Sequence, residues 1–141
     1  MQIKTSSFGT QTINPEDILN FPNGLLGFPE LTQFKLFHEE HENPTVHWLQ
    51  SITDENVAMS VVSPSVFGME YDIGLSTDEQ ELLKLVNPDD VLALLVIYKQ
   101  HEKNDADEID LKAIYRAPIF INTKTNIGIQ KSLTKLDINE V

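Results

Sequence analysis

Hydrophobic and polar residues alternate over several short stretches of this chain. Residues 46–52 show the alternation around Trp48, and Ile3, Thr5 and Ser7 occupy every second position near the N-terminus. A period of two residues is typical of β-strands that place one face in a core and the other in water. Further strands are predicted at residues 33–39, 57–63, 67–75, 91–99, 111–116, 119–123 and 127–133. Such short, regularly spaced strands predict an all-β fold, either a small antiparallel barrel or a sandwich.

Helix signals are few. Ser76 can cap a helix whose third residue is Glu79, and apolar residues follow, so we expect a helix over residues 77–86. Asn87-Pro88 should end this helix, because a residue before proline is disfavoured in the helical region. Short helical turns are also expected after Asn14, with Pro15 in the first position, and over residues 29–32.

The loops are marked by glycine, proline and charge. Asn23-Gly24 and Gly27 interrupt the stretch after Phe21, and residues 101–110 carry five acids and one lysine between two predicted strands, which is typical of a solvated hairpin loop. We find no repeat and no linker. At 141 residues, the chain is expected to form a single domain over residues 1–141, with a few short helices and one core.

The composition favours the cytoplasm. The chain has no cysteine, which excludes disulfides and thiolate sites and fits a reducing compartment. Residues 1–14 lack the basic start and apolar run of a secretory signal. The longest apolar run, residues 91–98, is far shorter than the roughly 20 residues of a membrane helix, so we expect neither export nor a membrane span.

The charge disfavours direct binding of nucleic acid. The formal net charge is −12, and phosphate backbones are bound mainly through lysine and arginine. Residues 1–110 hold 20 acids and 5 bases, whereas residues 111–141 hold 2 acids and 5 bases. The C-terminal segment is therefore expected beside acidic strands. The net acidity either serves solubility alone or indicates a basic protein partner.

One cluster has side chains that can bind metals, His38-Glu39-Glu40-His41-Glu42. The two histidines of a zinc-binding helix are four residues apart, whereas His38 and His41 are three apart at the end of a predicted strand. The chain also lacks a Gly-x-Ser-x-Gly nucleophile elbow and a phosphate-binding loop. We expect no catalytic residue, no metal and no cofactor. A small ligand- or metal-binding barrel, or a minor hydrolase, is the alternative.

Several motifs, in order, resemble those of the FliW family. The first is the turn from Phe21 to Phe28, Phe-Pro-Asn-Gly-Leu-Leu-Gly-Phe, and the second is Trp48-Leu49-Gln50-Ser51. The others are residues 62–72, which contain a proline and lead to a tyrosine, then residues 94–97, 117–122 and 128–130. Each piece alone is common, but together they cover nearly the whole chain.

This resemblance implies a β-barrel-like protein that is not an enzyme and that binds flagellin and the RNA-binding translational regulator CsrA. In that scheme FliW prevents CsrA from repressing flagellin translation, and accumulating flagellin removes FliW and restores repression. The acidic charge of this chain is compatible with a basic partner such as CsrA.

A candidate protein-binding face follows from the alternation in residues 67–72. Aromatic and methionine side chains would lie near carboxylates on one rim, as interfaces place apolar anchors inside a charged border. The predicted residues are Phe67, Met69, Glu70, Tyr71, Asp72, Asp78 and Glu79. The alternative is a solvated strand whose aromatic side chains belong to the core.

Overall fold

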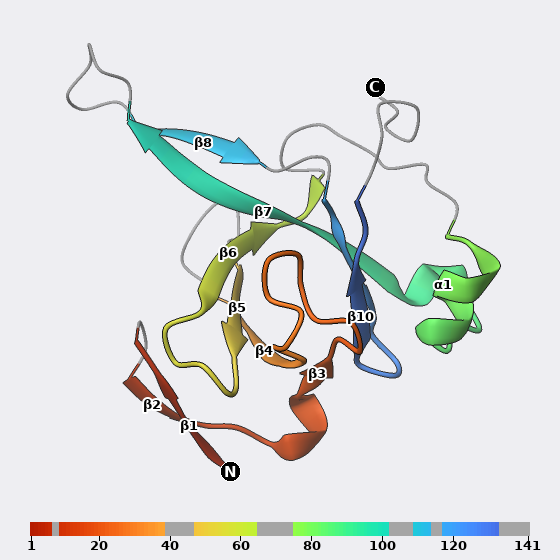
Figure 1. Cartoon of the computed structure of the whole chain (residues 1–141), viewed down its shortest axis with the longest axis horizontal. Coiled ribbons are helices and arrows are strands. Elements are labelled where there is room, and N and C mark those ends of the chain that lie inside the picture. Colours follow the sequence, from red (N-terminus) through yellow and green to blue (C-terminus); the bar gives the residue numbers. More distant parts are fainter. Residues whose placement is uncertain (7–8, 39–46, 65–74, 102–108, 114–116, 133–141) are drawn as a thin grey trace.

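Seven strands form a closed sheet in the computed structural model, which describes residues 1–6, 9–38, 47–64, 75–101, 109–113 and 117–132. The strands are β3 (Leu19–Asn20), β4 (Gln33–His38), β5 (His47–Ser51), β6 (Ala58–Val62), β7 (Val91–His101), β9 (Ile119–Asn122) and β10 (Ile127–Gln130). They pair in the order β6-β5-β4-β3-β10-β9-β7, and a pairing between β6 and β7 closes the ring (Figure 1). Strand β8 (Ile109–Ala113) pairs with β7 beyond the ring. The predicted all-β, barrel-like fold is confirmed.

The ring is antiparallel apart from one pairing in the described part of the chain. Strand β3 runs parallel to β10, with Asn20 opposite Ile127. This contact joins residues more than a hundred positions apart, and it is supported by the hydrogen bond from Asn20 N–H to the Asn126 carbonyl oxygen at 2.8 Å. A parallel neighbour was not predicted, because a two-residue strand carries no alternation of its own.

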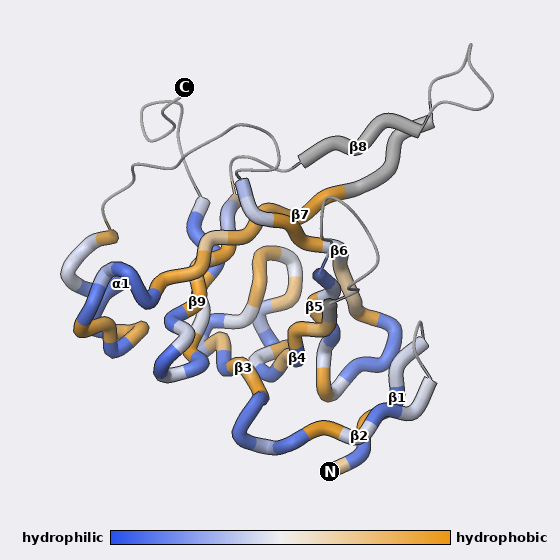
Figure 2. Tube along the Cα trace, turned by 180° about the vertical axis from the view of Figure 1, so that it is seen from behind, coloured by the Kyte–Doolittle hydropathy of each residue, from blue (hydrophilic) through white to orange (hydrophobic). Residues whose placement is uncertain are grey.

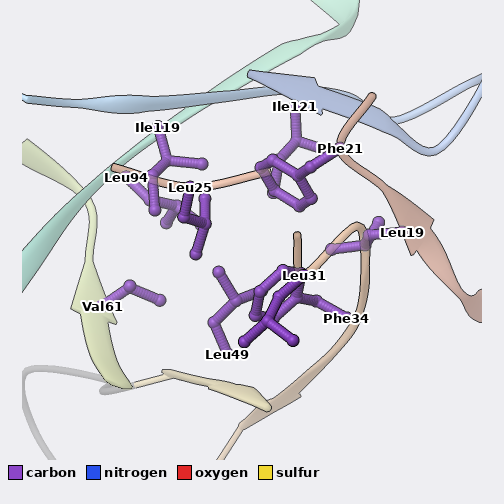
Figure 3. Close-up of a cluster of buried hydrophobic side chains, with 10 residues drawn as sticks. All are labelled: Leu19, Phe21, Leu25, Leu31, Phe34, Leu49, Val61, Leu94, Ile119 and Ile121. Carbon is purple, nitrogen blue, oxygen red and sulfur yellow. The ribbon is translucent and has the colours of Figure 1, made fainter. Parts of the chain in front are cut away.

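Side chains fill the interior of the barrel. The segment between β3 and β4 turns inward and passes through the middle of the ring (Figure 1). It places Phe21 against Phe34 in an edge-to-face contact with ring centroids 5.4 Å apart. Figure 3 shows the cluster of ten buried residues: Leu19, Phe21, Leu25, Leu31, Phe34, Leu49, Val61, Leu94, Ile119 and Ile121. The barrel therefore encloses a packed core.

Two smaller apolar clusters attach further elements to different sides of the barrel (Figure 2). Helix α1 (Thr77–Leu82) and the 3-10 turn η3 (Pro88–Asp90) lie beside β9 and β10, where Leu83, Phe120 and Ile129 form the buried centre. The hairpin of β1 (Gln2–Thr5) and β2 (Gly9–Thr12), followed by the 3-10 turn η1 (Pro15–Asp17), packs through Ile3, Ile13 and Ile18 against Phe37 and Ile52.

The element boundaries correct some of the sequence predictions. Helix α1 ends at Leu82, earlier than the predicted 77–86. Within residues 29–32, where a helical turn was expected, only residues 29–30 form a turn, which the hydrogen bond from the Leu31 N–H to the Phe28 carbonyl oxygen closes. The short turn after Asn14 is confirmed as η1, with Pro15 in the first position. Strands β2 and β3 were not predicted. The strand expected at residues 67–75 lies outside the described residues, apart from Leu75.

Candidate protein-binding surface

Helix α1 begins with the capping box that the sequence predicts. Ser76 Oγ accepts a hydrogen bond from the Glu79 backbone N–H at 3.1 Å, and Glu79 Oε1 accepts one from the Ser76 N–H at 2.7 Å. The pair satisfies N–H groups that the first helical turn leaves without partners. Glu79 Oε1 also lies 2.9 Å from Lys131 Nζ. A base from residues 111–141 thus meets an acidic residue of helix α1, whereas the charge distribution predicted acidic strands as its neighbours.

The Glu79 side chain is a charged carboxylate at neutral pH, and its contacts with Ser76 and Lys131 favour that charge. Partial burial raises the pKa of Glu79, but the Ser76 hydrogen bonds and the Lys131 ammonium favour the carboxylate and outweigh it. The pKa of Glu79 therefore lies below its ordinary value. Of the two predicted site residues on α1, Glu79 is held by contacts within the protein, whereas Asp78 is exposed to solvent.

The helix ends in a turn that points Val86 into solvent. The Lys84 N–H donates to the Glu81 carbonyl oxygen at 3.0 Å and the Leu85 N–H donates to the Gln80 carbonyl oxygen at 2.9 Å. Lys84 has a φ of 53°. This is the left-handed helix end usually made by glycine. Val86 follows it with 96% of its surface exposed.

Polar side chains of the barrel hold this turn in place. Buried Asn122 donates from Nδ2 to the Leu83 carbonyl oxygen at 2.9 Å and to that of Lys84 at 3.4 Å. Thr125 Oγ1 also donates to the Leu83 carbonyl oxygen, at 3.0 Å. The end of α1 is therefore tied to the turn between β9 and β10, and Val86 is presented from a constrained backbone.

Carboxylates dominate the segment that carries Val86. Residues 77–90 contain five acids and one lysine. Glu79 is paired with Lys131, but no ion pair joins any of the other four to the described residues. We call the group of Asp78, Glu81, Val86, Asp89 and Asp90 the acidic α1 surface. Beside it, an open hollow of about 410 Å³ is lined by Thr77, Gln80, Glu81, Lys84, Leu85 and Val86. An apolar centre with a charged border suits a basic protein partner.

The remaining predicted site residues lie outside the described part of the chain. These are Phe67, Met69, Glu70, Tyr71 and Asp72. Where they lie relative to Asp78 and Glu79 is therefore still a prediction, and these two residues of α1 are the described members of the face predicted from the sequence.

The inward segment between β3 and β4 exposes a second apolar pair at its tip. Leu26 is 54% exposed and Phe28 is 37% exposed, whereas their neighbour Leu25 is buried in the core. Gln130 holds the tip, because its Oε1 accepts from the Leu26 N–H at 2.8 Å and its Nε2 donates to the Ala117 carbonyl oxygen at 3.0 Å. A hollow of about 230 Å³ lies between this segment and β10.

Sequence reasoning missed the role of three amide side chains. Asn122 holds the end of α1, Gln130 holds the inward segment, and fully buried Gln50 donates to backbone carbonyl oxygens of the turn after β5 at 3.1–3.5 Å. Asn122 and Gln130 are the last residues of their strands, and Gln50 is the last but one of β5. That position is the available signal, because a neutral amide can both donate to and accept from backbone groups.

The described residues include no group of three or more histidine, cysteine or acidic side chains that could hold a metal ion. The metal-binding candidate from the sequence, residues 38–42, falls almost entirely outside them, and the side chain of His38 is not described. In the same described part, no helix combines the length and apolar character needed to cross a bilayer.

Comparisons with known proteins point to one family. The family model described as FliW protein matches residues 2–140. A flagellar assembly factor FliW of Azoarcus sp. (strain BH72) is 33% identical over 136 residues, covering 96% of this chain and 93% of the relative. One from Moorella thermoacetica is 38% identical over 130 residues, covering 92% of this chain and 79% of the relative.

The fold agrees with the sequence match. A crystal structure of the flagellar assembly factor FliW superimposes with a TM-score of 0.83 at 27% identity, covering 99% of this chain and 94% of the other. The shared barrel and the end-to-end sequence match lead to one conclusion. This chain belongs to the FliW family of flagellar assembly factors.

Proposed function

We propose that this protein is a non-enzymatic regulator of flagellar assembly that acts in the cytoplasm by binding other proteins. It binds flagellin and a CsrA-type RNA-binding regulator, and its binding to the latter relieves repression of flagellin translation. Membership of a family whose members are named flagellar assembly factors supports the general role. The two partners are those that the sequence resemblance implies.

The acidic α1 surface is the observation that carries the proposal. An RNA-binding protein must present lysine and arginine to phosphates, so its surface is basic. Asp78, Glu81 and Asp89 are exposed, and Glu81 lines the same hollow as the exposed Val86 on its constrained turn. Complementary charges of this kind raise the association rate and orient the partner, while an apolar anchor supplies contact area.

We include the seven residues predicted from the sequence in this face. Phe67, Met69 and Tyr71 would supply further apolar anchors, and Glu70 and Asp72 would extend the acidic border toward Asp78. Glu79 contributes indirectly, since its capping box and its ion pair with Lys131 fix the start of α1.

The packed interior favours action through the outer surface over the alternative of a ligand-binding barrel. Barrels that hold a small molecule keep an open cavity between their strands, whereas ten buried apolar residues fill this one (Figure 3).

Binding of purified flagellin and of the CsrA-type regulator from the same organism tests the proposal. In a biosensor experiment, Asp78→Lys plus Glu81→Lys should slow association with the basic regulator at least about tenfold. Glu70→Lys plus Asp72→Lys tests the predicted extension in the same way.

The matched control is Glu16→Lys plus Asp17→Lys on η1, which makes the same change of charge on exposed carboxylates of another element. It should leave association largely unchanged. If the wild-type protein binds neither flagellin nor the regulator, the proposed function is wrong. If the control slows association as much as the α1 pair does, the assignment to α1 is wrong.

A further inference from the structure

Within the described part of the chain, β1 pairs with β2 along one edge and with no strand along the other. Ile13 N–H donates to the Met1 carbonyl oxygen at 2.8 Å, and the register places Ile3 opposite Gln11. Backbone groups alternate between the two sides of a strand, so Met1 and Ile3 face β2 whereas Gln2 and Lys4 face away. Among the residues that the structure describes, none forms a hydrogen bond with the backbone of Gln2 or Lys4.

A hollow of about 460 Å³ runs along this free edge. Residues Met1 to Lys4 form one wall and residues Ile52 to Asn56 form the other. Two residues beyond Lys4, the Ser6 N–H donates to the Glu55 carbonyl oxygen at 3.0 Å and Ser6 Oγ donates to Asn56 Oδ1 at 2.7 Å, so Ser6 contacts the opposite wall directly. Ser6 belongs to the same outward-facing set as Gln2 and Lys4, so the turn after β5 already pairs with this edge at one position.

Both walls are held in place before any partner arrives. On the hairpin side, Ile3 is buried against the barrel. On the other side, the Nε2 of buried Gln50 lies 3.1–3.5 Å from the carbonyl oxygens of Ser51, Asp54, Glu55 and Val57, which share its two N–H groups. Ser51 Oγ accepts from the Asp54 N–H at 3.0 Å. A preformed edge of this kind lowers the entropy lost when a strand is added.

We propose that an extended segment of the basic regulator adds to β1 as a further strand in this hollow, an inference that rests on the proposed function. The donors and acceptors of Gln2 and Lys4 offer up to four backbone hydrogen bonds. A segment of about four residues, roughly 13 Å long, matches the edge. Asp54 and Glu55 on the opposite wall outnumber Lys4 and suit a segment that carries basic side chains.

Lys4→Pro tests this edge directly. Proline removes the outward N–H and places its ring in the hollow, while the bonds of Ile3 and Thr5 toward β2 are retained, and proline is tolerated at a free strand edge. We expect binding of the purified regulator to weaken at least about tenfold. Thr12→Pro is the matched control, because Thr12 faces outward from β2 on the opposite side of the hairpin. It should bind like the wild type.

Amide hydrogen exchange of the wild-type protein provides a second measurement that does not depend on the folding of a variant. The Gln2 and Lys4 amides should exchange at least about tenfold more slowly in the complex with the regulator, whereas the Thr10 and Thr12 amides should not change. If the wild type binds the regulator but these two amides are not protected, the inference is wrong while the proposed function stands. Lack of any binding by the wild type overturns the proposed function itself.

Discussion

At the scale of single residues, two glycines in the inward segment have different structural roles. Gly24 and Gly27 have φ angles of 66° and 86°, which are unfavourable for other residues. A Cβ at Gly24 would also lie 2.5 Å from the Phe28 carbonyl oxygen and 2.6 Å from that of Pro29, whereas a Cβ at Gly27 would meet nothing within 4 Å. The sequence predicts a break at both glycines but not this difference between them.

Gly27→Ala should therefore lower the free energy of unfolding by about 1–2 kcal/mol, the cost of the left-handed backbone alone. Gly24→Ala should cost distinctly more, because backbone atoms cannot move aside as a flexible side chain can. Urea unfolding of both variants measures the difference. Equal losses of stability would show that the close approach at Gly24 does not constrain the segment.

The inward course of this segment was not predictable from its local pattern. Asn23-Gly24 and Gly27 indicate a turn, and turns usually lie on the surface. Leu25 belongs to the same buried cluster as side chains of β3 to β7 and of β9, and the Leu26 N–H donates to Gln130 Oε1 at 2.8 Å. Neither contact is local, since Gln130 on β10 lies about a hundred residues further along the chain and the strands around Leu25 come together only in the folded ring.

At the scale of elements, the stability of helix α1 depends on contacts at its two ends. A six-residue helix is too short to be stable alone, so its capping box, its left-handed final turn and the cluster around Leu83 must hold it. Lys84 adopts the conformation that glycine prefers at this position. The local sequence predicted where α1 begins, because Ser76 and Glu79 form the motif of a capping box. It did not predict where α1 ends, because a lysine at position 84 gives no sign of a left-handed turn.

Lys84→Gly should raise the free energy of unfolding by about 0.5–1 kcal/mol, because glycine relieves the left-handed backbone at little other cost. Lys84→Ala is the control, since it removes the same exposed side chain but keeps a Cβ. Thermal unfolding should give the higher melting temperature for the glycine variant. A lower melting temperature for glycine than for alanine would contradict the strain at Lys84.

The ion pair of Glu79 gives the helix a predictable pH dependence. Its pKa is lowered by folding, so its stabilising effect is present above the ordinary value of 4.5 and is lost as the pH falls through the lower pKa of the folded state. Glu79→Gln should reduce the free energy of unfolding by about 0.5 kcal/mol at pH 7, the size of a screened ion pair near the surface.

This difference between the wild type and Glu79→Gln should shrink as the pH falls below 4.5 and through the lower pKa of Glu79 in the folded protein. Urea unfolding over that range measures it, with Glu81→Gln as the control because Glu81 makes no ion pair with the described residues. A difference that is unchanged at low pH would mean that the charge of Glu79 is not responsible.

At the scale of the whole molecule, the alternation of apolar and polar residues predicted most of the strands. It did not predict that the sheet closes into a ring, because closure depends on pairing between distant strands. Strand β2 reads Gly-Thr-Gln-Thr, which has no apolar residue to mark it, and β3 has two residues. The pairings that close the ring, β3 with β10 and β6 with β7, join distant segments. The pattern of a single sequence shows which face of each strand is apolar, but it does not show which distant strands pair. For this reason the pattern alone could not distinguish a barrel from a sandwich.

The charge of the whole molecule makes a final prediction about binding. With a formal charge of −12, the protein attracts a basic partner over distances set by the Debye length, about 10 Å at 0.1 M salt and 3 Å at 1 M. Its association rate with the CsrA-type regulator should therefore fall steeply as salt increases, while the dissociation rate changes less. Stopped-flow or biosensor kinetics at several salt concentrations measure both rates. Asp78→Asn plus Glu81→Gln should flatten the salt dependence more than Glu16→Gln plus Asp17→Asn, although each pair removes the same charge. Equal flattening by the two pairs would show that net charge alone steers the partner and that the acidic α1 surface has no special position in the encounter.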